Sequence, residues 1–321
     1  MRVNFSTVIA LLTSATPAVH AHYFFDVLVI DGVESKHIEY VRENTREIKY
    51  MPTKFINTFD NLTPLSTDFR CNLGAGSGSS TNVAKVAPGT PLAFKLAVGA
   101  TMQHPGPAFV YMSKAPGDVK EYAGDGDWFK IHQEGICNDG PVTTSAWCTW
   151  DKDRISFQIP TDTPAGQYLV RVEHVGLHGA HAGEAEFFYA CGQIEVTGNG
   201  SGVPGPMVKF PGAYQPKDAS WNFGVYGTDR DFPFPEPAVW TSGDSGAGSN
   251  TIQPTSTAAV PVSSQTPVSS QTHVTSATSA TQASFSSQTP VSSQTPVTGG
   301  NNAGKPSKCS AKKHRKRAHA H

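Results

Sequence analysis

The most constraining feature of this chain is a set of short runs rich in β-branched and aromatic residues, each bounded by Gly, Pro, Asp or Asn. Such runs are typical of β-strands, because these side chains pack well on a pleated surface. In QYLVRVEHV, alternation places Tyr168, Val170, Val172 and His174 on one face of a strand. No part of the chain shows a sustained helical period. The strand-like runs are residues 25–32, 91–99, 109–114, 154–160, 166–177 and 184–198.

These runs predict an all-β fold. They all lie within residues 22–240, a length that suits a single β-sandwich domain. The stretches 41–90 and 115–150 carry little strand pattern. We therefore expect long loops there, which can build a functional surface on a rigid sandwich.

Residues 1–21 have the three parts of a secretory signal peptide. Arg2 provides a positive start, an apolar core follows, and Val19 and Ala21 occupy the −3 and −1 positions of a cleavage site. The apolar core is far shorter than the ~20 residues that a membrane-spanning helix needs. We therefore expect cleavage after Ala21, secretion to the extracellular space, and a mature chain that begins at His22.

The composition changes abruptly after Trp240. Residues 241–304 form a Ser/Thr/Pro-rich, low-complexity linker in which SSQTPV recurs. This composition cannot bury enough apolar surface to offset chain entropy, and it is typical of an extended, O-glycosylated stalk. The basic, His-rich tail, residues 305–321, holds seven lysines and arginines and no acid. The rest of the mature chain has 17 basic residues against 26 acidic ones, so a basic tail follows an acidic body.

The cysteines and glycosylation signals are those of a secreted protein. In an oxidising compartment, the four cysteines of the domain predict two disulfides, and Cys309 remains in the tail. Acceptor motifs for N-glycosylation occur at Asn61 and Asn199. The sequence by itself does not decide the pairing among Cys71, Cys137, Cys148 and Cys191.

A histidine at the start of the mature chain presents two nitrogen ligands together. The α-amine and Nδ1 of His22 would close a six-membered chelate ring, and such nitrogen ligands suit Cu(II). An α-amine ordinarily has a pKa of about 8, so the metal must displace its proton. A third nitrogen must come from elsewhere, and spacing does not choose among His37, His104, His132, His174, His178 and His181.

Several fragments, in their order and spacing, resemble the fungal lytic polysaccharide monooxygenases, a copper family active mainly on cellulose. The resemblance covers residues 22–240 and implies an immunoglobulin-like β-sandwich with one copper ion on a flat face. The fragments are HYFFDVLVIDG (22–32), DFRCN (68–72), HPGPAFVYMSKAP (104–116), RVEHVGLHGAHAGEAEFFYACGQIEVTG (171–198), GPMVKFPGAY (205–214) and PFPEPAVW (233–240).

The same resemblance assigns individual residues. His22 would supply its amine and Nδ1 to copper, and His104 the third nitrogen. His178 falls where the family keeps a histidine that is not a ligand but lies near the oxygen species, so we expect it to be a catalytic residue.

The resemblance also implies a disulfide pairing. Cys71 and Cys191 match the family's common bridge, which would close a loop of about 120 residues and stabilise the fold by roughly 4–5 kcal/mol. Cys137 and Cys148 are then left to pair with each other.

The chain departs from the family pattern near the copper. Counting back from Cys191, the family usually has tyrosine three residues earlier and glutamine five residues earlier, where this chain has Phe188 and Glu186. Phe188 would occupy the axial position without ligating, and Glu186 would accept a hydrogen bond or move a proton. Tyr189 is the alternative axial residue, but in a regular strand it faces the opposite side, so only a bulge would bring it to the metal.

The resemblance implies oxidative cleavage of glycosidic bonds in cellulose, related β-1,4-glucans or hemicellulose. Hydrogen would be abstracted at C1, C4 or both, with O2 or H2O2 and an external electron donor. The alternative is a non-catalytic secreted protein that binds copper or polysaccharide. We expect a monomer with no specific nucleic-acid partner and no membrane span. Aromatic residues that suit either the substrate face or the core are Tyr23, Phe24, Trp221, Tyr226 and Phe232.

Overall fold

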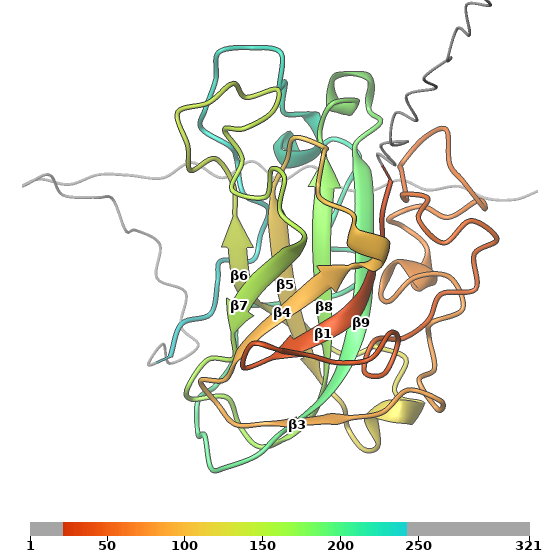
Figure 1. The fold of residues 1–321 in the computed structure, drawn as a ribbon, viewed down its shortest axis with the longest axis vertical. Helices are drawn as coiled ribbons and strands as arrows, with labels where there is room; N and C mark the ends of the chain where they lie inside the picture. The colour runs from red at the N-terminus through yellow and green to blue at the C-terminus, as the bar shows by residue number, and fades with distance from the viewer. Residues whose placement is uncertain (1–21, 243–321) are drawn as a thin grey trace, which may run out of the picture. The chain divides into compact units, whose positions relative to one another are not determined.

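The computed structural model describes residues 22–242, which form a sandwich of two β-sheets (Figure 1). One sheet has the strand order β2-β1-β4-β7 and the other the order β10-β6-β5-β8-β9-β3. The predicted all-β sandwich class is therefore confirmed. The strands are β1 Phe25–Ile30, β2 Val33–Glu34, β3 Ala84–Val86, β4 Pro91–Leu96, β5 Ala108–Lys114, β6 Trp128–Glu134, β7 Arg154–Gln158, β8 Gly166–Gly176, β9 Glu186–Val196 and β10 Met207–Val208.

The helical elements of residues 22–242 are single 3-10 turns. None of the helices in this part of the chain is long and apolar enough to cross a lipid bilayer. The predicted signal peptide, residues 1–21, the linker from residue 243 onward and the basic tail lie outside the described residues. The turns are η1 Thr67–Phe69, η2 Ala97–Gly99, η3 Val119–Glu121, η4 Ala180–Ala182 and η5 Ala219–Asn222.

Each of the six strand-like runs contains all or most of a strand, but the prediction of long loops is partly wrong. Strand β3 lies within residues 41–90 and pairs with β9, and residues 115–150 also contain a strand. Strand β6 lies there and pairs with β5. Its sequence is WFKIHQE, in which Lys130 interrupts the apolar residues at the beginning of the strand. This charged residue hides the strand pattern. Lys130 is nevertheless buried, and its Nζ donates to the carbonyl of Pro235 at 2.6 Å and to Oε1 of Gln133 at 3.0 Å. Those bonds satisfy a buried polar group that hydropathy alone would place in solvent.

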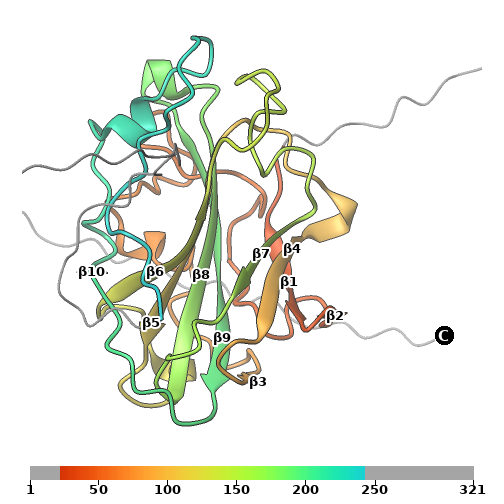
Figure 2. The ribbon, with the colours of Figure 1, turned by 90° about the vertical axis from the view of Figure 1, so that its left-hand side faces the viewer.

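Strands β8 and β9 form the longest ladder of the described domain and run through its centre (Figure 2). They pair without a register shift from Gly166↔Val196 to Gly176↔Glu186. One face of this pair packs in the core between the two sheets, and the other packs under the long loops. Because side chains alternate along a strand, neighbouring residues of β9 belong to different cores.

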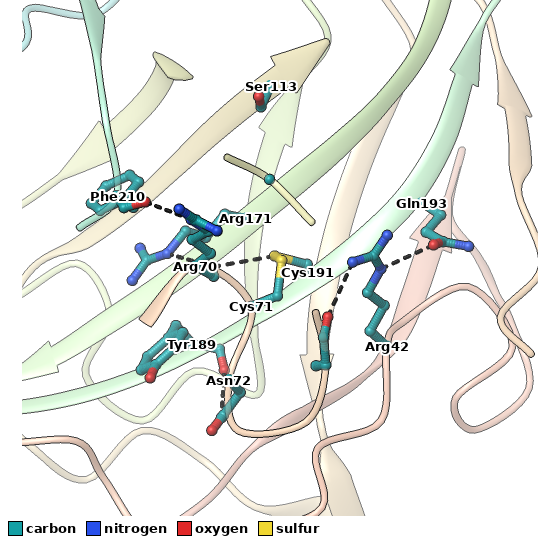
Figure 3. The surroundings of a disulfide bond; sticks show 12 residues. Arg42, Arg70, Cys71, Asn72, Ser113, Arg171, Tyr189, Cys191, Gln193 and Phe210 are labelled. Carbon is teal, nitrogen blue, oxygen red and sulfur yellow. Dashed lines mark hydrogen bonds between the residues drawn. A yellow bond between two sulfur atoms is a disulfide. The ribbon is translucent and has the colours of Figure 1, made fainter. Parts of the chain in front are cut away.

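The long loop that precedes β3 is tied onto β9. The Cys71–Cys191 disulfide joins the two segments (Figure 3). Nearby, Nε of Arg42 donates to Oε1 of Gln193 at 2.9 Å, and Nδ2 of Asn72 donates to the carbonyl of Tyr189 at 3.2 Å. These buried hydrogen bonds fix the position of the loop along β9, so the loop is a rigid part of the domain.

A second disulfide, Cys137–Cys148, closes a short loop after β6. On the buried face near the first disulfide, the Arg171 guanidinium lies 4.5–4.7 Å from the ring centres of Phe69, Tyr189 and Phe210. Figure 3 shows Arg171 together with Tyr189 and Phe210. The guanidinium donates to Oε1 of Glu173 at 2.7 Å. Ring faces and a carboxylate thus offset the cost of burying this charge.

Candidate metal centre

Three imidazoles converge on one carboxylate at the end of the sandwich where β8 finishes and β9 begins. Oε2 of Glu186 lies 3.7 Å from Nε2 of His22, and 3.8 Å from Nε2 of both His104 and His178. His22, His104 and Glu186 each offer a ligand atom, and these three atoms lie within 4.8 Å of one another. The site residues named from the sequence are thus brought together from four separate segments.

The segments that carry these groups are fixed by the β8–β9 ladder. Glu186 is the first residue of β9, and His178 lies two residues beyond the end of β8. The loop that holds His104 extends the edge of β8, because the carbonyls of Pro105 and Pro107 accept hydrogen bonds from the amides of Leu177 and Val175 at 2.8 and 3.0 Å. His104 is therefore held by main-chain bonds on its C-terminal side.

Two glycines allow this close approach of backbone segments. A Cβ atom on Gly106 would lie 1.8 Å from the carbonyl oxygen of Val175, and the φ angle of Gly106 is +158°. A Cβ atom on Gly176 would lie 3.0 Å from the Cβ of His104. Side chains at these positions would push the His104 loop away from β8.

The Phe188 ring packs against both expected copper ligands, whose own ring centroids are 5.7 Å apart. Its centroid is 5.4 Å from that of His104, with nearly parallel planes, and 5.9 Å from that of His22. His104 in turn stacks on His178 at 4.7 Å. Phe188 is 3% exposed and has no ligand atom, so an apolar ring fills the space beneath the imidazoles.

Tyr189 points away from this site. Its hydroxyl lies 3.0 Å from Oγ1 of Thr53, and its ring packs in the core under the loops. The β8–β9 ladder keeps its register here, with Phe188 opposite His174 and Tyr189 opposite Glu173. The bulge that would exchange Phe188 for Tyr189 is therefore not formed.

Burial favours the metal-binding form of the histidines. It lowers the pKa of His22, and the positive charge of Lys54 lowers it further. Burial also lowers the pKa of His178, so both rings are held as neutral imidazoles, the form that binds metals. Burial raises the pKa of Glu186 to about 7, against the opposing effect of Lys54. Nζ of Lys54 is itself paired with Oε2 of Glu184 at 2.9 Å.

The donor set fits copper. Imidazole nitrogens and a terminal amine are ligands that Cu(II) prefers. The buried Oε2 of Glu186 has no hydrogen-bond partner among residues 22–242. Its separation from the three imidazoles exceeds a hydrogen bond and leaves room for a further atom among them.

Two details of His22 differ from the expected chelate. The ring atom that faces Glu186 is Nε2, whereas the six-membered chelate uses Nδ1, so the ring must turn about its Cβ–Cγ bond. In the full-length chain the nitrogen of His22 also belongs to the peptide bond with Ala21. It becomes a free amine only when that bond is cut.

The other four candidate histidines do not face the Glu186 carboxylate, although His174 packs beneath the group against Tyr23 and Phe188. His37 is ion-paired with Asp26 beside β1, and His132 lies on β6. His174 is fully buried within β8, and His181 contacts the edge of Tyr226. The structure therefore brings only His104 and His178, of the six candidates, to His22.

The surface around the site contains aromatic side chains that the sequence analysis partly missed. Tyr50 stacks on His22 with a centroid distance of 6.4 Å and is 37% exposed. Tyr226 is 66% exposed, which suits the substrate face rather than the core. Tyr23, Trp221 and Phe232 are instead in the core, at 3%, 1% and 8% exposure. A tyrosine at the end of the largely polar segment 42–50 was the available signal for Tyr50.

A cavity of about 480 Å³ opens beside His22. It is lined by Tyr50 and by the loop of residues 97–101, among others. Val98, at the tip of this loop, is fully exposed and has a φ angle of 55°, a region that β-branched residues rarely adopt. The surface next to the candidate metal centre is thus mainly apolar and hollowed on the His22 side.

Comparison with known proteins assigns this site to a family. The family model of Auxiliary Activity family 9 (formerly GH61) matches residues 22–232. A lytic polysaccharide monooxygenase A of Aspergillus fumigatus is 59% identical over 246 residues, which cover 75% of this chain and 84% of that protein. A monooxygenase D of Emericella nidulans is 58% identical over 247 residues, covering 76% and 85%.

Solved structures agree with the sequence relatives. A cellulose-active polysaccharide monooxygenase from M. thermophila superimposes with a TM-score of 0.57 at 26% identity, covering 68% of this chain and 99% of that one. The identities to the fungal relatives show the enzyme class, which sets aside the alternative of a non-catalytic binding protein. The chain belongs to Auxiliary Activity family 9 and is a copper-dependent lytic polysaccharide monooxygenase, an oxidoreductase that cleaves polysaccharides.

Proposed function

We propose that the chain is secreted, is cut after Ala21, and cleaves cellulose or related β-1,4-glucans oxidatively at C1, C4 or both. It would act as a monomer that holds one copper ion and accepts electrons from an external donor. The observation that carries the proposal is the convergence of His22, His104 and His178 on Glu186 at 3.7–3.8 Å, at an end of the sandwich that solvent reaches.

His22 and His104 would hold the copper. After cleavage His22 offers its amine and one ring nitrogen, and His104 offers Nε2. The bound copper supplies one-electron redox chemistry and the activation of O2 or H2O2. Phe188 packs against both rings and would keep water out of the space beneath them.

Glu186 and His178 are proposed to handle protons at the site. The His178 side chain is 38% exposed, whereas that of Glu186 is 10% exposed, so His178 stands between solvent and the buried carboxylate. A carboxyl group with a pKa of about 7 exchanges protons readily near neutral pH. Oε2 of Glu186 would take up a proton through His178 and present it at the face shared with His22 and His104.

The glucan chain is proposed to lie across the exposed rings beside the metal. Tyr50 and Tyr226 present aromatic surface of the kind that stacks on the apolar faces of sugar rings. The cavity beside His22 adds a hollow along the same surface. Support for cellulose comes from the M. thermophila relative, whose description is cellulose-active.

The first prediction concerns the products. Copper-loaded mature protein, given a reductant and H2O2, should release from cellulose oligosaccharides that are oxidised at C1, as a lactone or aldonic acid, or at C4, as a ketone. Mass spectrometry should detect them. A His104→Ala variant should release none, because it lacks one copper ligand. Native, unoxidised oligosaccharides from the wild-type protein would instead indicate hydrolysis, and the absence of products from cellulose, xylan and glucomannan would overturn the proposal.

The second prediction concerns the axial position. Phe188→Tyr should change the Cu(II) electron paramagnetic resonance spectrum, because a hydroxyl enters the space next to the metal, while copper affinity should stay within about threefold. Tyr189→Phe is the matched control, since it removes a hydroxyl from the opposite face of β9 and should leave the spectrum unchanged. A reversed pattern would show that Tyr189 is the axial residue.

The third prediction concerns proton transfer. Glu186→Gln installs the residue that the family usually has at this position, so turnover should persist. The pH dependence of turnover should lose the step near pH 7 that the titration of Glu186 produces in the wild type. Copper affinity, measured by calorimetry, should change little. Glu184→Gln, two residues away on the exposed side of the Lys54 pair, serves as the control and should keep the step. A wild-type pH profile in Glu186→Gln would remove this carboxylate from proton transfer.

A further inference from the structure

We propose that Tyr23 and His174 form a positioning pair that fixes the first residue of the mature chain at the metal centre. This inference rests on the proposed function, because it concerns how His22 is held as a ligand. Neither residue has a ligand atom in the group formed by His22, His104 and Glu186. Their effect on the metal would act through His22 and Phe188.

A chain end needs an anchor if it is to hold a metal. Terminal residues fray unless side chains or main-chain bonds tie them down. Strand β1 begins only at Phe25, so residues 22–24 stand outside the ladder. Phe24 lies two residues after His22, and its carbonyl accepts a hydrogen bond from the amide of Ala97 at 3.0 Å. The residue next to His22 must therefore provide the closer restraint.

Tyr23 provides that restraint through a short buried hydrogen bond. Its hydroxyl lies 2.5 Å from Nδ1 of His174, and the two residues are 3% and 0% exposed. One of these two atoms donates a proton to the other, so the bond satisfies a phenol and a ring nitrogen that are both closed off from solvent.

His174 is a rigid support because it lies inside the sheet. On β8 it stands opposite Phe188 of β9 on one side and Ala108 of β5 on the other. A residue in the middle of three paired strands cannot shift without breaking both ladders. Through His174, the central sheet therefore fixes the position of the Tyr23 hydroxyl.

The Tyr23 ring connects this fixed hydroxyl to the metal centre, because it packs against residues of the centre. Its centroid lies 4.5 Å from that of Phe188 and 5.9 Å from that of His104. The ring thus packs against the proposed axial residue and near the second proposed copper ligand. A shift of Tyr23 would move His22 by the covalent chain and would also disturb the packing of Phe188.

A merely space-filling role would not need the polar atoms. Two apolar side chains of similar shape would fill this part of the core at little or no cost in stability. A phenol and an imidazole in an apolar layer bind each other in one geometry, because any other leaves two buried polar groups unsatisfied. The pair therefore selects one position of the chain end among those that packing alone would permit.

Tyr23→Phe tests the pair, with Tyr168→Phe as the matched control. Tyr168 is also a buried tyrosine of the inter-sheet core, and its hydroxyl donates to the carbonyl of Pro164 at 2.7 Å, at the other end of β8. In the mature protein, Tyr23→Phe should weaken Cu(II) binding by about tenfold, the effect of losing one buried hydrogen bond, and should alter the electron paramagnetic resonance spectrum. Tyr168→Phe should lower thermal stability similarly but leave copper binding and spectrum as in the wild type.

The double variant Tyr23→Phe/His174→Leu separates positioning from stability. It removes both polar partners, so its thermal stability should recover relative to Tyr23→Phe. The altered spectrum and the weaker copper binding should persist. If copper binding recovers together with stability, or if Tyr23→Phe and Tyr168→Phe behave alike, the pair has no positioning role. Failure of the wild-type protein to bind copper would instead refute the proposed function.

Discussion

The structure depends on the continuous ladder between β8 and β9. Eleven residues on each strand pair without a shift, and both faces of the pair are buried. Alternation along β9 sends Glu186 and Phe188 toward the metal centre, and sends Tyr189 and Cys191 toward the layer of loops. A slip of one residue would exchange these two sets, so the register of one strand pair decides both the metal site and the disulfide that holds the loops.

A metal ligand at the end of a chain needs additional contacts to fix its position, whereas a ligand inside the chain is held by the backbone on both sides. His104 and His178 are held by main-chain bonds at the end of β8, whereas His22 precedes the first strand. In this chain an apolar ring, Phe188, and a buried phenol–imidazole pair lie beneath the first residue. The centre therefore combines an accessible outer side, bordered by Tyr50, with a tightly packed inner side.

The sequence was sufficient for the fold class and for six of the strands, because their β-branched runs alternate clearly. It was insufficient for β6, where the buried Lys130 finds partners that only the folded chain brings near. Histidine spacing alone did not single out His104, because the side chains of the site come from four segments that meet only through the sheet. The resemblance to the family was needed. Tyr23 and His174 were each considered for other roles, because a contact across 151 residues leaves no local pattern.

The central claim is that the free amine of His22 is a copper ligand. Copper affinity should be measured by competition titration for the chain that begins at His22 and for the same chain with Ala21 retained. Retention of Ala21 converts the amine into an amide and so removes a copper ligand. Loss of a residue that only supports a metal ligand weakens metal binding by roughly 10- to 100-fold. Retention of Ala21 should therefore weaken copper binding by more than that. Equal affinity of the two chains would contradict the account, because the imidazoles and Glu186 would then suffice to hold the metal.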